Sequence, residues 1–424
     1  MNLQLDITNI KDVKFADKTA VNHGILYINR QELRELLGTD HRFSKVDIEL
    51  AHPGESCRIV QVFDVTEPRA KIGGCGENFP GALGKIETAG RGVTRVLKGA
   101  AIVTVDYTSE MKDAMVLDMS GPGTELGLYG KLQNVILLCR PIDGIERYDF
   151  QNALRIAGLK AAVYLAEAAK DIKADETEIY DLGPLSEAGK ELEHLPRVAY
   201  VYQIHSLQQS VDKPVNEPIY YGDNVSKLLP TILHPNEILD GAIVRGYYCQ
   251  GVETYSIQNH PIIRELYKRH GKELYFAGVV ITAAQYTEPD RVRSAIIAAK
   301  LAKEVLAADG AVLTKIGGGA PHVDLAQTCE ECEKLGVKTA IVVADHSTDG
   351  SAEGALLFNT PYADAIVNFG SFSSFFTLPP MEKIIGDPIT FGGKPANSEI
   401  QVNTYILAGG SSQLGASKQL MVEI

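Results

Sequence analysis

The chain has 424 residues, of which 45% are apolar and 22% are charged. This length exceeds what one hydrophobic core usually serves and indicates about two or three domains, while the composition is typical of a globular protein. The 41 basic and 54 acidic residues leave a net charge of -13. Such a field repels phosphate backbones and anionic bilayers, so we expect neither nucleic acid nor a membrane surface as a partner.

The amino terminus and the cysteine usage favour the cytoplasm. The opening stretch, MNLQLDITNIKDVKF, carries charges and no apolar run of signal-peptide length, and no later window has the length of a membrane span. The six cysteines are scattered through the chain rather than dense, as they would be in a small secreted protein. We therefore expect reduced thiols.

The first part of the chain predicts short strands separated by turns. GILYINRQEL, KVDIELAHPG and SCRIVQVFDV (24–33, 45–54 and 56–65) are short for helices and partly alternate apolar with polar residues, which predicts antiparallel strands. The glycine-rich residues 73–92 predict an ordered loop at a surface or interface. A helix is predicted over 145–170, where apolar residues recur every three and four positions.

The later part of the chain predicts alternating strands and helices. After a buried strand expected at 196–207, strands are expected at 273–282, 310–316, 338–345 and 363–370, and these alternate with helices at 290–309 and 324–336. This order predicts a parallel sheet with helices on both faces. The expected fold class is α/β: a β-rich mixed N-terminal half, 1–240, followed by a doubly wound parallel-sheet C-terminal domain, 241–424.

A glycine run and a pair of cysteines fall in this second half. TKIGGGAPHVDL places Gly317, Gly318 and Gly319 between a strand and a helix, where backbone N–H groups can meet an anion, although a tight turn explains the run equally well. Cys329 and Cys332 have the spacing of a redox dithiol or half a zinc site. They fall late in a helix without a second pair, so we expect two helix thiols, one of them buried, and no metal.

Three further side chains have the chemistry of a site. Asp345 and His346 follow a strand at its carboxyl end, where a histidine can exchange protons near neutral pH, although a capping turn is a slightly better explanation. His260 precedes Pro261, which favours an extended backbone, and gains interest only if it lies near Cys249. Cys249 itself lies in RGYYCQGVE, which lacks the apolar pattern of a core element.

Several stretches together resemble a known family, the proprotein subunit of component B of glycine, sarcosine and betaine reductases. They span nearly the whole chain in order: PGESCRIVQVFDVTEPRAKI, TRVLKGAAIVTVD, VLDMSGPG, ALRIAGLKAAVYLAEAAK, RVAYVYQ, LHPNEILDGAIV, NHPIIRELYKRHGKELYFAGVVIT and LPPMEKIIGDP. The resemblance implies a precursor that cuts itself before a cysteine, which becomes an amino-terminal pyruvoyl group. It assigns that catalytic role to Cys249. The substrate-binding candidates beside it are Tyr248, Tyr255, Asn259, His260, Gly317, Gly318, Gly319, Asp345 and His346.

The same resemblance implies the reaction and the partners. A pyruvoyl carbonyl condenses with a substrate amine and weakens its C–N bond. A selenocysteine on a separate component B subunit attacks the α-carbon of a small carboxylate, and downstream reductase components take the product on to acetyl phosphate. An oligomeric assembly is therefore expected.

One departure keeps an alternative open. The family typically has Asn or Thr before the processing cysteine and a second cysteine a few residues on, whereas this chain has Tyr248 and only Cys249. The alternative is an unprocessed member that acts as a non-catalytic substrate-binding or assembly subunit.

Overall fold

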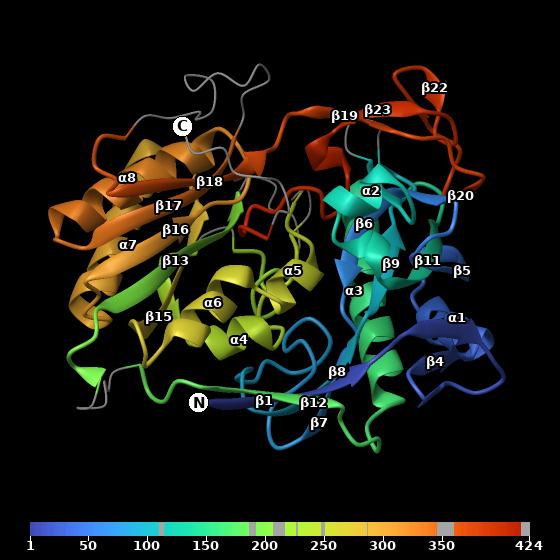
Figure 1. Ribbon diagram of the computed structural model, residues 1–424, viewed down its shortest axis with the longest axis horizontal. Coiled ribbons are helices and arrows are strands. Elements are labelled where there is room, and N and C mark those ends of the chain that lie inside the picture. Colours follow the sequence, from blue (N-terminus) through green and yellow to red (C-terminus); the bar gives the residue numbers. More distant parts are fainter. Residues whose placement is uncertain are drawn as a thin grey trace.

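The computed structural model shows a mixed α/β protein in which two large sheets stand side by side, joined by a third sheet and by the helices between them (Figure 1). It describes residues 1–109, 114–185, 192–206, 217–225, 228–246, 251–285, 287–345 and 360–416. The α/β class is thus confirmed. The finer division into a β-rich half and a doubly wound half, and the boundary at 240/241, remain predictions.

The first large sheet has the strand order β10-β6-β9-β11-β5, with β20 added to β6. Its strands are β5 (Phe43–Ala51), β6 (Cys57–Thr66), β9 (Ala100–Val105), β10 (Met115–Asp118), β11 (Gln133–Pro141) and β20 (Lys383–Ile385). β6 pairs antiparallel with β9 and β10, as β5 does with β11, whereas β9 and β11 are parallel. The long helix α3 (Arg147–Glu167) packs on this sheet, as its apolar period predicts.

The second large sheet has the order β14-β15-β13-β16-β17-β18. Its strands are β13 (Arg197–Ser206), β14 (Thr231–Leu233), β15 (Tyr275–Ala284), β16 (Gly310–Thr314), β17 (Lys338–Asp345) and β18 (Ala365–Ser371). All pairs are parallel except β14 with β15. β13 and β14 come from before residue 241, so this sheet draws on both predicted halves.

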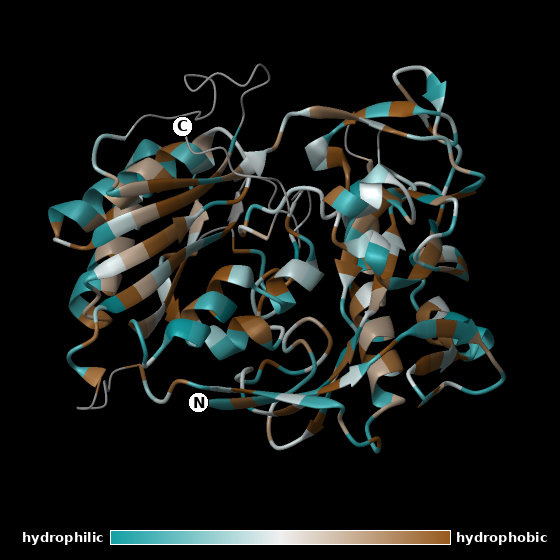
Figure 2. Cartoon of the chain, in the orientation of Figure 1, coloured by the Kyte–Doolittle hydropathy of each residue, from teal (hydrophilic) through white to brown (hydrophobic). Residues whose placement is uncertain are grey.

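Helices cover both faces of the second sheet. On one face Ala199 and Val201 of β13 share a core with α7 (Glu288–Lys300) and α8 (Ala320–Lys334). On the other, Tyr200 and Tyr202 pack with α4 (Pro235–Leu239), α5 (Thr254–Gln258) and α6 (Pro261–Arg269). In Figure 2 hydrophobic colour follows the strands of both large sheets and most of α3.

Two segments cross between the large sheets. At one end, β1 (Asn2–Asn9) pairs with β12 (Glu176–Asp181) and β8 (Gly92–Lys98), which pairs with β7 (Arg69–Gly73). At the other, the chain after β18 returns to the first sheet, where the β20 strand pairs with β6 (Figure 1). The buried Arg58 donates to Asp118 and to the carbonyls of Pro379 and Ala396, which fastens this returning segment.

Smaller elements complete the described chain. They are β2 (Asp12–Phe15), β3 (Ala20–Asn22), β4 (Ile25–Ile28), α1 (Arg30–Gly38), α2 (Pro122–Leu126), β19 (Phe375–Leu378), β21 (Thr390–Phe391), β22 (Lys394–Pro395) and β23 (Ile400–Asn403). Short turns of other helix types in the described residues are Tyr129–Lys131, Leu301–Val305 and Thr404–Ile406.

One strand prediction is partly wrong. The run 24–33 forms a strand only to Ile28, because Asn29 caps α1 by accepting hydrogen bonds from the backbone N–H groups of Gln31 and Glu32. Residues 74–91 lie between β7 and β8 without a helix or named strand, as predicted for the loop. None of the described helices is long and apolar enough to cross a membrane.

Candidate functional site

A bulge in β6 creates the floor of the candidate site. Gln61 has a φ of 58°, and the pairing with β9 skips a residue: Val62 faces Val105 and Asp64 faces Thr104, which leaves Phe63 without an opposite partner. Bulges of this kind re-aim side chains next to functional sites. Here the ring of Phe63 faces two guanidinium groups, Arg155 of α3 at 5.6 Å and Arg245 at 5.2 Å.

Arg245 is a buried cation without an anion at hydrogen-bond distance among the described residues. Its exposed fraction is 4%, and its Nε and Nη1 atoms have no hydrogen-bond partner there. The backbone holds it in place, because Arg155 Nε donates to the Arg245 carbonyl (2.7 Å) and the Arg245 N–H donates to Thr254 Oγ1 (3.2 Å). The positive charge of Arg245 acts to lower the pKa values of Asp64 and Glu253.

Both oxygens of the Asp64 carboxylate accept hydrogen bonds from the protein. Oδ1 accepts from the backbone N–H groups of Val65 (2.8 Å) and Thr254 (2.9 Å), and Oδ2 accepts from Thr254 Oγ1 (2.6 Å). Burial raises the pKa of Asp64 above its usual range, and Arg245 and Thr254 oppose that shift. Asp64 therefore anchors the start of α5 to β6.

Glu253, by contrast, has a hydrogen-bond partner among the described residues for only one of its two carboxylate oxygens. Its Oε2 accepts from Tyr129 Oη (2.7 Å), which is also within 2.9 Å of Ser256 Oγ. Its Oε1 is buried and has no partner among the described residues. Burial raises the pKa of Glu253, while Arg245 lowers it. Phe63, Asp64, Tyr129, Arg245 and Glu253 are called the Arg245 cluster below.

The Arg245 cluster lies next to the predicted catalytic residue in the sequence. Arg245 precedes Cys249 by four positions and Glu253 follows it by four. Cys249 and Tyr248, like His346, lie outside the described residues. Their predicted roles therefore stay predictions.

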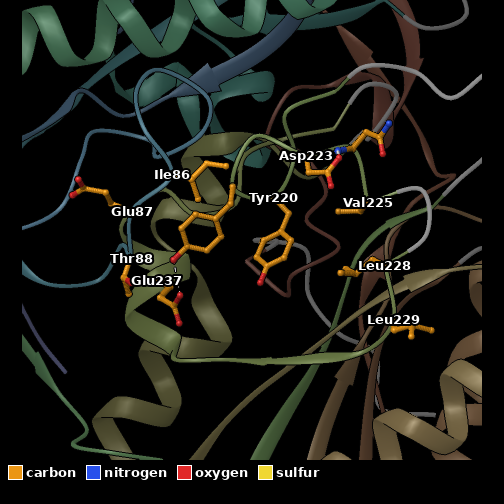
Figure 3. A pocket seen from close by; sticks show the side chains of 11 residues that line it. Ile86, Glu87, Thr88, Tyr220, Asp223, Val225, Leu228, Leu229 and Glu237 are labelled. Atoms are coloured by element: carbon orange, nitrogen blue, oxygen red, sulfur yellow. Dashed lines mark hydrogen bonds between the residues drawn. The ribbon is translucent and has the colours of Figure 1, made fainter.

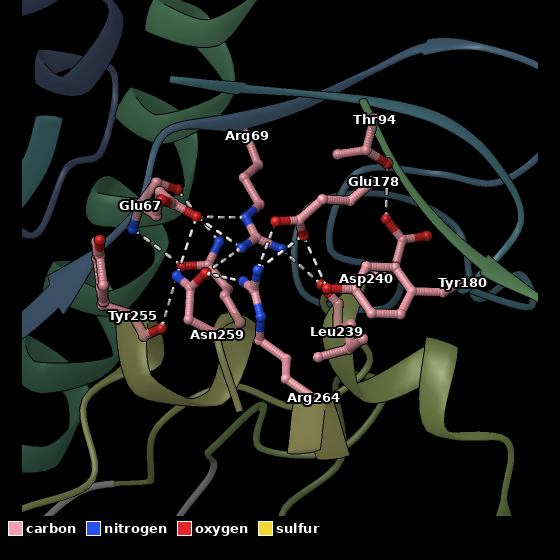
Figure 4. Close-up of polar contacts among 11 residues, drawn as sticks. Glu67, Arg69, Thr94, Glu178, Tyr180, Leu239, Asp240, Tyr255, Asn259 and Arg264 are labelled. Carbon is pink, nitrogen blue, oxygen red and sulfur yellow. Dashed lines mark hydrogen bonds and ion pairs between the residues drawn. The ribbon is translucent and has the colours of Figure 1, made fainter. Parts of the chain in front are cut away.

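Asn259 and Tyr255 lie at a second polar cluster, where all the charges are paired (Figure 4). Arg69 donates to Glu67 (2.8 and 2.6 Å) and to Asn259 Oδ1 (3.1 Å), and Asn259 Nδ2 donates to Glu67 (3.0 Å). Arg264 donates to Asn259 (3.0 Å) and to both oxygens of Glu178 (2.6 and 2.8 Å). We call these five residues, Glu67, Arg69, Glu178, Asn259 and Arg264, the paired network; it ties β6 and β7 to α6.

His260 is enclosed in the core of the second sheet. It is fully buried, its ring meets Tyr200 and Tyr202 edge-on with centroids 5.2 and 5.0 Å apart, and its Nε2 lies 3.3 Å from Tyr200 Oη. Burial lowers its pKa to about 3. This histidine is neutral at physiological pH.

The structure connects the glycine turn to the chain that follows Cys249. The Gly317 N–H donates to Gln413 Oε1 (2.8 Å), and the Gln413 N–H donates to the Gly251 carbonyl (2.9 Å). Gly317 and Gly319 have positive φ values of 88° and 72°, which explains glycine at these two positions, and a Cβ at Gly319 would meet open space. Gly318 likewise borders open space.

A buried lysine stands beside this turn. Lys315 is 3% exposed, its Nζ donates to the Gly317 carbonyl (2.6 Å), and burial lowers its pKa to about 7. A lysine with such a pKa exchanges protons near neutrality, a common property of functional sites.

The remaining sequence candidates lie elsewhere. Asp345 is half-buried at the carboxyl end of β17, and its carbonyl accepts from Phe372 N–H (2.7 Å). Cys329 and Cys332 both lie in α8 as predicted, but both are buried, not one, because the apolar face of α8 packs on the sheet. Within the described ranges all five cysteines are free thiols, and no group of three or more metal-ligating side chains is gathered.

A separate open pocket of about 1030 Å³ lies where residues 86–88 face residues 220–225 and 228–229 (Figure 3). Tyr221 Oη donates to Glu237 Oε1 (2.5 Å) in its wall, and burial raises the pKa of Glu237. Of the sequence-predicted residues that the structure describes, none lines this pocket.

Comparison with known proteins places the whole chain in one group. The family model described as glycine/sarcosine/betaine reductase component B subunits matches residues 1–419. The chain belongs to this family. No solved structure matches it.

Curated relatives agree with this assignment. The chain is 38% identical over 431 residues to glycine reductase complex component B subunits alpha and beta of Acetoanaerobium sticklandii, covering 99% of both chains. It is 38% identical to sarcosine reductase complex component B subunit alpha of Peptoclostridium acidaminophilum, covering 91% of this chain and 89% of that one. It is 31% identical to betaine reductase complex component B subunit alpha of the same organism, covering 91% and 88%. The resemblance inferred from the sequence is thus confirmed, and membership of a reductase complex implies partner subunits.

Sequence reasoning missed Arg245, Glu253, Asp64 and Lys315. A weak signal exists for two of them. Arg245 interrupts the apolar run GAIVRG, and Lys315 interrupts AVLTKIG at the end of a strand. Charges at such buried positions are rare unless they are paired or functional. Asp64 and Glu253 come together only through the bulge in β6.

Proposed function

We propose that this chain is the component B subunit of a selenoprotein-dependent reductase that cleaves the C–N bond of a small amine-bearing carboxylate, with a pyruvoyl group formed from Cys249. The match to component B over residues 1–419 carries this proposal. The Arg245 cluster supports it, because Arg245 and Glu253 flank Cys249 in the sequence and each has a buried polar atom without a partner among the described residues.

Two residues that flank Cys249 in the sequence fit the substrate of such a group. A pyruvoyl group supplies an electrophilic carbonyl that condenses with an amine. Arg245 and Glu253 each retain buried polar atoms that no described residue satisfies, so a small polar acid bound beside them would complete their hydrogen bonds. Phe63 provides an apolar floor that keeps water away from these charges.

Glu253 is the proposed proton carrier. Tyr129 holds its Oε2, and burial raises its pKa, so Oε1 can retain a proton at higher pH than an exposed glutamate. In the proposed displacement a selenolate of the partner subunit forms a bond to the α-carbon while the C–N bond breaks and its electron pair leaves with nitrogen. Glu253, ionised when the substrate ammonium binds, can take a proton from that ammonium as the amine condenses and return it to the departing nitrogen.

The test is the intact mass of the purified chain. Processing before Cys249 yields two fragments, and a carbonyl reagent should label the smaller one. Cys249→Ala should remain one chain, whereas Cys75→Ala, at an exposed cysteine, should be cut like the wild type. A single unlabelled mass with a free thiol at Cys249 would contradict the pyruvoyl mechanism.

That contradictory result would favour the alternative of a non-catalytic assembly or substrate-binding subunit. The single cysteine of RGYYCQGVE and Tyr248 before it are the observations behind this alternative. It requires that Cys249→Ala leaves assembly with the partner and turnover unchanged.

A further inference from the structure

We propose that Arg245 and Glu253 form a clamp for a zwitterion, in which Arg245 binds the carboxylate of the substrate and Glu253 Oε1 accepts a hydrogen bond from its amine. The inference rests on the proposed function, because it assigns the residues that recognise the substrate of that reaction. It makes Arg245 and Glu253 binding residues for a small amino acid with at least one N–H.

The first support is the state of Arg245. A guanidinium buried without an anion at hydrogen-bond distance is costly, and proteins retain such groups mainly where a ligand completes them. Arg245 is 4% exposed, with Nε and Nη1 unsatisfied among the described residues. By contrast, the similarly buried Arg69 and Arg58 each hold a carboxylate by hydrogen bonds from two nitrogens.

The second support is the way in which Arg245 is held. Its guanidinium faces the ring of Phe63, and its backbone is fixed by Arg155 and Thr254. With Cζ over this ring, Nε and Nη1 have no hydrogen-bond partner among the described residues, so these N–H groups can donate to a carboxylate. The side chain is thus positioned before the ligand arrives, which lowers the entropic cost of binding.

The third support identifies the amine end. Asp64 is also buried nearby, but both of its oxygens already accept hydrogen bonds. Glu253 has one oxygen held by Tyr129 and one without a partner among the described residues. Of the two carboxyl groups that Arg245 influences, only Glu253 has an acceptor left for an N–H donor.

The clamp predicts an order of binding affinities among four small ligands. Glycine offers a carboxylate and an ammonium, acetate only the carboxylate, and methylammonium only the amine. Trimethylglycine has the carboxylate and a cationic nitrogen without any N–H. Glycine should therefore bind more tightly than each of the other three.

The experiment measures binding by ligand-observed NMR with these four compounds and the full-length Cys249→Ala chain, in which no bond to the ligand can form. Adding Arg245→Gln should weaken glycine and acetate binding on the order of 100-fold, and Arg245→Lys about 10-fold. Adding Glu253→Gln should weaken glycine binding about 10-fold and leave acetate binding unchanged. Circular dichroism confirms that each variant is folded, and Arg245→Lys replaces Arg245→Gln if the latter is not.

Three results would overturn the clamp. They are glycine binding that survives Arg245→Gln, trimethylglycine that binds as tightly as glycine, and a folded parent chain that binds neither glycine nor acetate.

Failure of the clamp is distinguishable from failure of the proposed function. If the complex reconstituted with its selenoprotein partner releases amine and Arg245→Gln retains the wild-type KM, the clamp is wrong and the function stands. If glycine binding depends on both residues and no amine is released from any substrate, the function is wrong and the clamp stands.

Discussion

The paired network and the Arg245 cluster both contain a buried arginine and a buried glutamate, Arg69 with Glu67 and Arg245 with Glu253, but they differ in how these charges are satisfied. In the paired network Arg69 contacts Glu67, Asn259 and the carbonyl of Leu239. In the Arg245 cluster the guanidinium faces an aromatic ring, and one oxygen of Glu253 has no partner among the described residues. The first cluster joins parts of the fold, whereas we propose that the unsatisfied polar atoms of the second bind a ligand.

This difference has an energetic consequence. Removing one member of a satisfied buried pair leaves its partner uncompensated, which is strongly destabilising. Removing a charge that has no close partner eliminates a desolvation cost instead. Stability measurements can therefore separate structural from functional charges.

The largest expected effect is that of Arg69→Met, which leaves the buried Glu67 without its main cation. We expect a loss of about 3–5 kcal/mol in the free energy of unfolding, measured by urea denaturation. The matched control is Arg245→Met, which should change stability by less than about 1 kcal/mol because no anion lies at hydrogen-bond distance among the described residues. Equal losses in the two variants would remove the distinction between the clusters.

Lys315→Met extends the comparison to the second sheet. Burial lowers the pKa of Lys315 to about 7, so between pH 7 and the usual lysine value of 10.5 the unfolded chain binds more protons than the folded one. The wild type should therefore gain stability as pH rises through this window, whereas the variant should lack that gain. At pH 7 the variant should be more stable by a few kcal/mol. A variant that is less stable at pH 7 would indicate that Lys315 has a structural ion-pair role.

His260 tests how a buried, neutral side chain makes the stability of the fold depend on pH. Burial lowers its pKa to about 3 from 6.5, so its stabilising neutral state is fully present above pH 6.5 and is lost as pH falls toward 3. Replacement by Gln should reduce the slope of stability against pH by up to about 1.4 kcal/mol per pH unit between pH 6 and 4. The exposed His23 serves as the control, because His23→Asn should leave that slope unchanged. An unchanged slope in His260→Gln would show that another group governs acid sensitivity.

The smallest expected effect on stability is that of Glu253→Gln. The variant keeps an acceptor for Tyr129 and removes a charge whose ionised form is disfavoured by burial, so we expect a change within about 1 kcal/mol. Glu67→Gln is the corresponding change in the paired network and should cost more, because Arg69 then loses its anion. A larger loss for Glu253→Gln than for Glu67→Gln would contradict the comparison.

The local elements were predictable because their patterns are periodic. The helix expected at 145–170 is α3, and the strands expected around 275–282 and 338–345 are β15 and β17. The course of the chain between the sheets was not predictable. The long-range pairing of β20 with β6 depends on contacts such as Arg58 with the carbonyl of Ala396, which no local pattern encodes.

For the candidate site, the sequence points to Cys249 but does not point to the charged residues Arg245 and Glu253. Cys249 was identified by resemblance, and its role remains a prediction. Arg245 and Glu253 could not be paired from sequence, because the bulge at Phe63, whose ring lies by the guanidinium, depends on pairing with β9. Asn259 and His260 attracted attention as polar residues beside a proline, but the former contacts Glu67 and two arginines, and the latter packs between two tyrosines.

The most direct test of the central claim is amine release by the complex reconstituted with its selenoprotein partner, with glycine as substrate and with Arg245→Gln compared to Arg69→Gln at a temperature where both variants are folded. The account predicts that Arg245→Gln raises KM on the order of 100-fold or abolishes turnover, whereas Arg69→Gln keeps the wild-type KM. Wild-type kinetics in Arg245→Gln, together with a raised KM in Arg69→Gln, would contradict it.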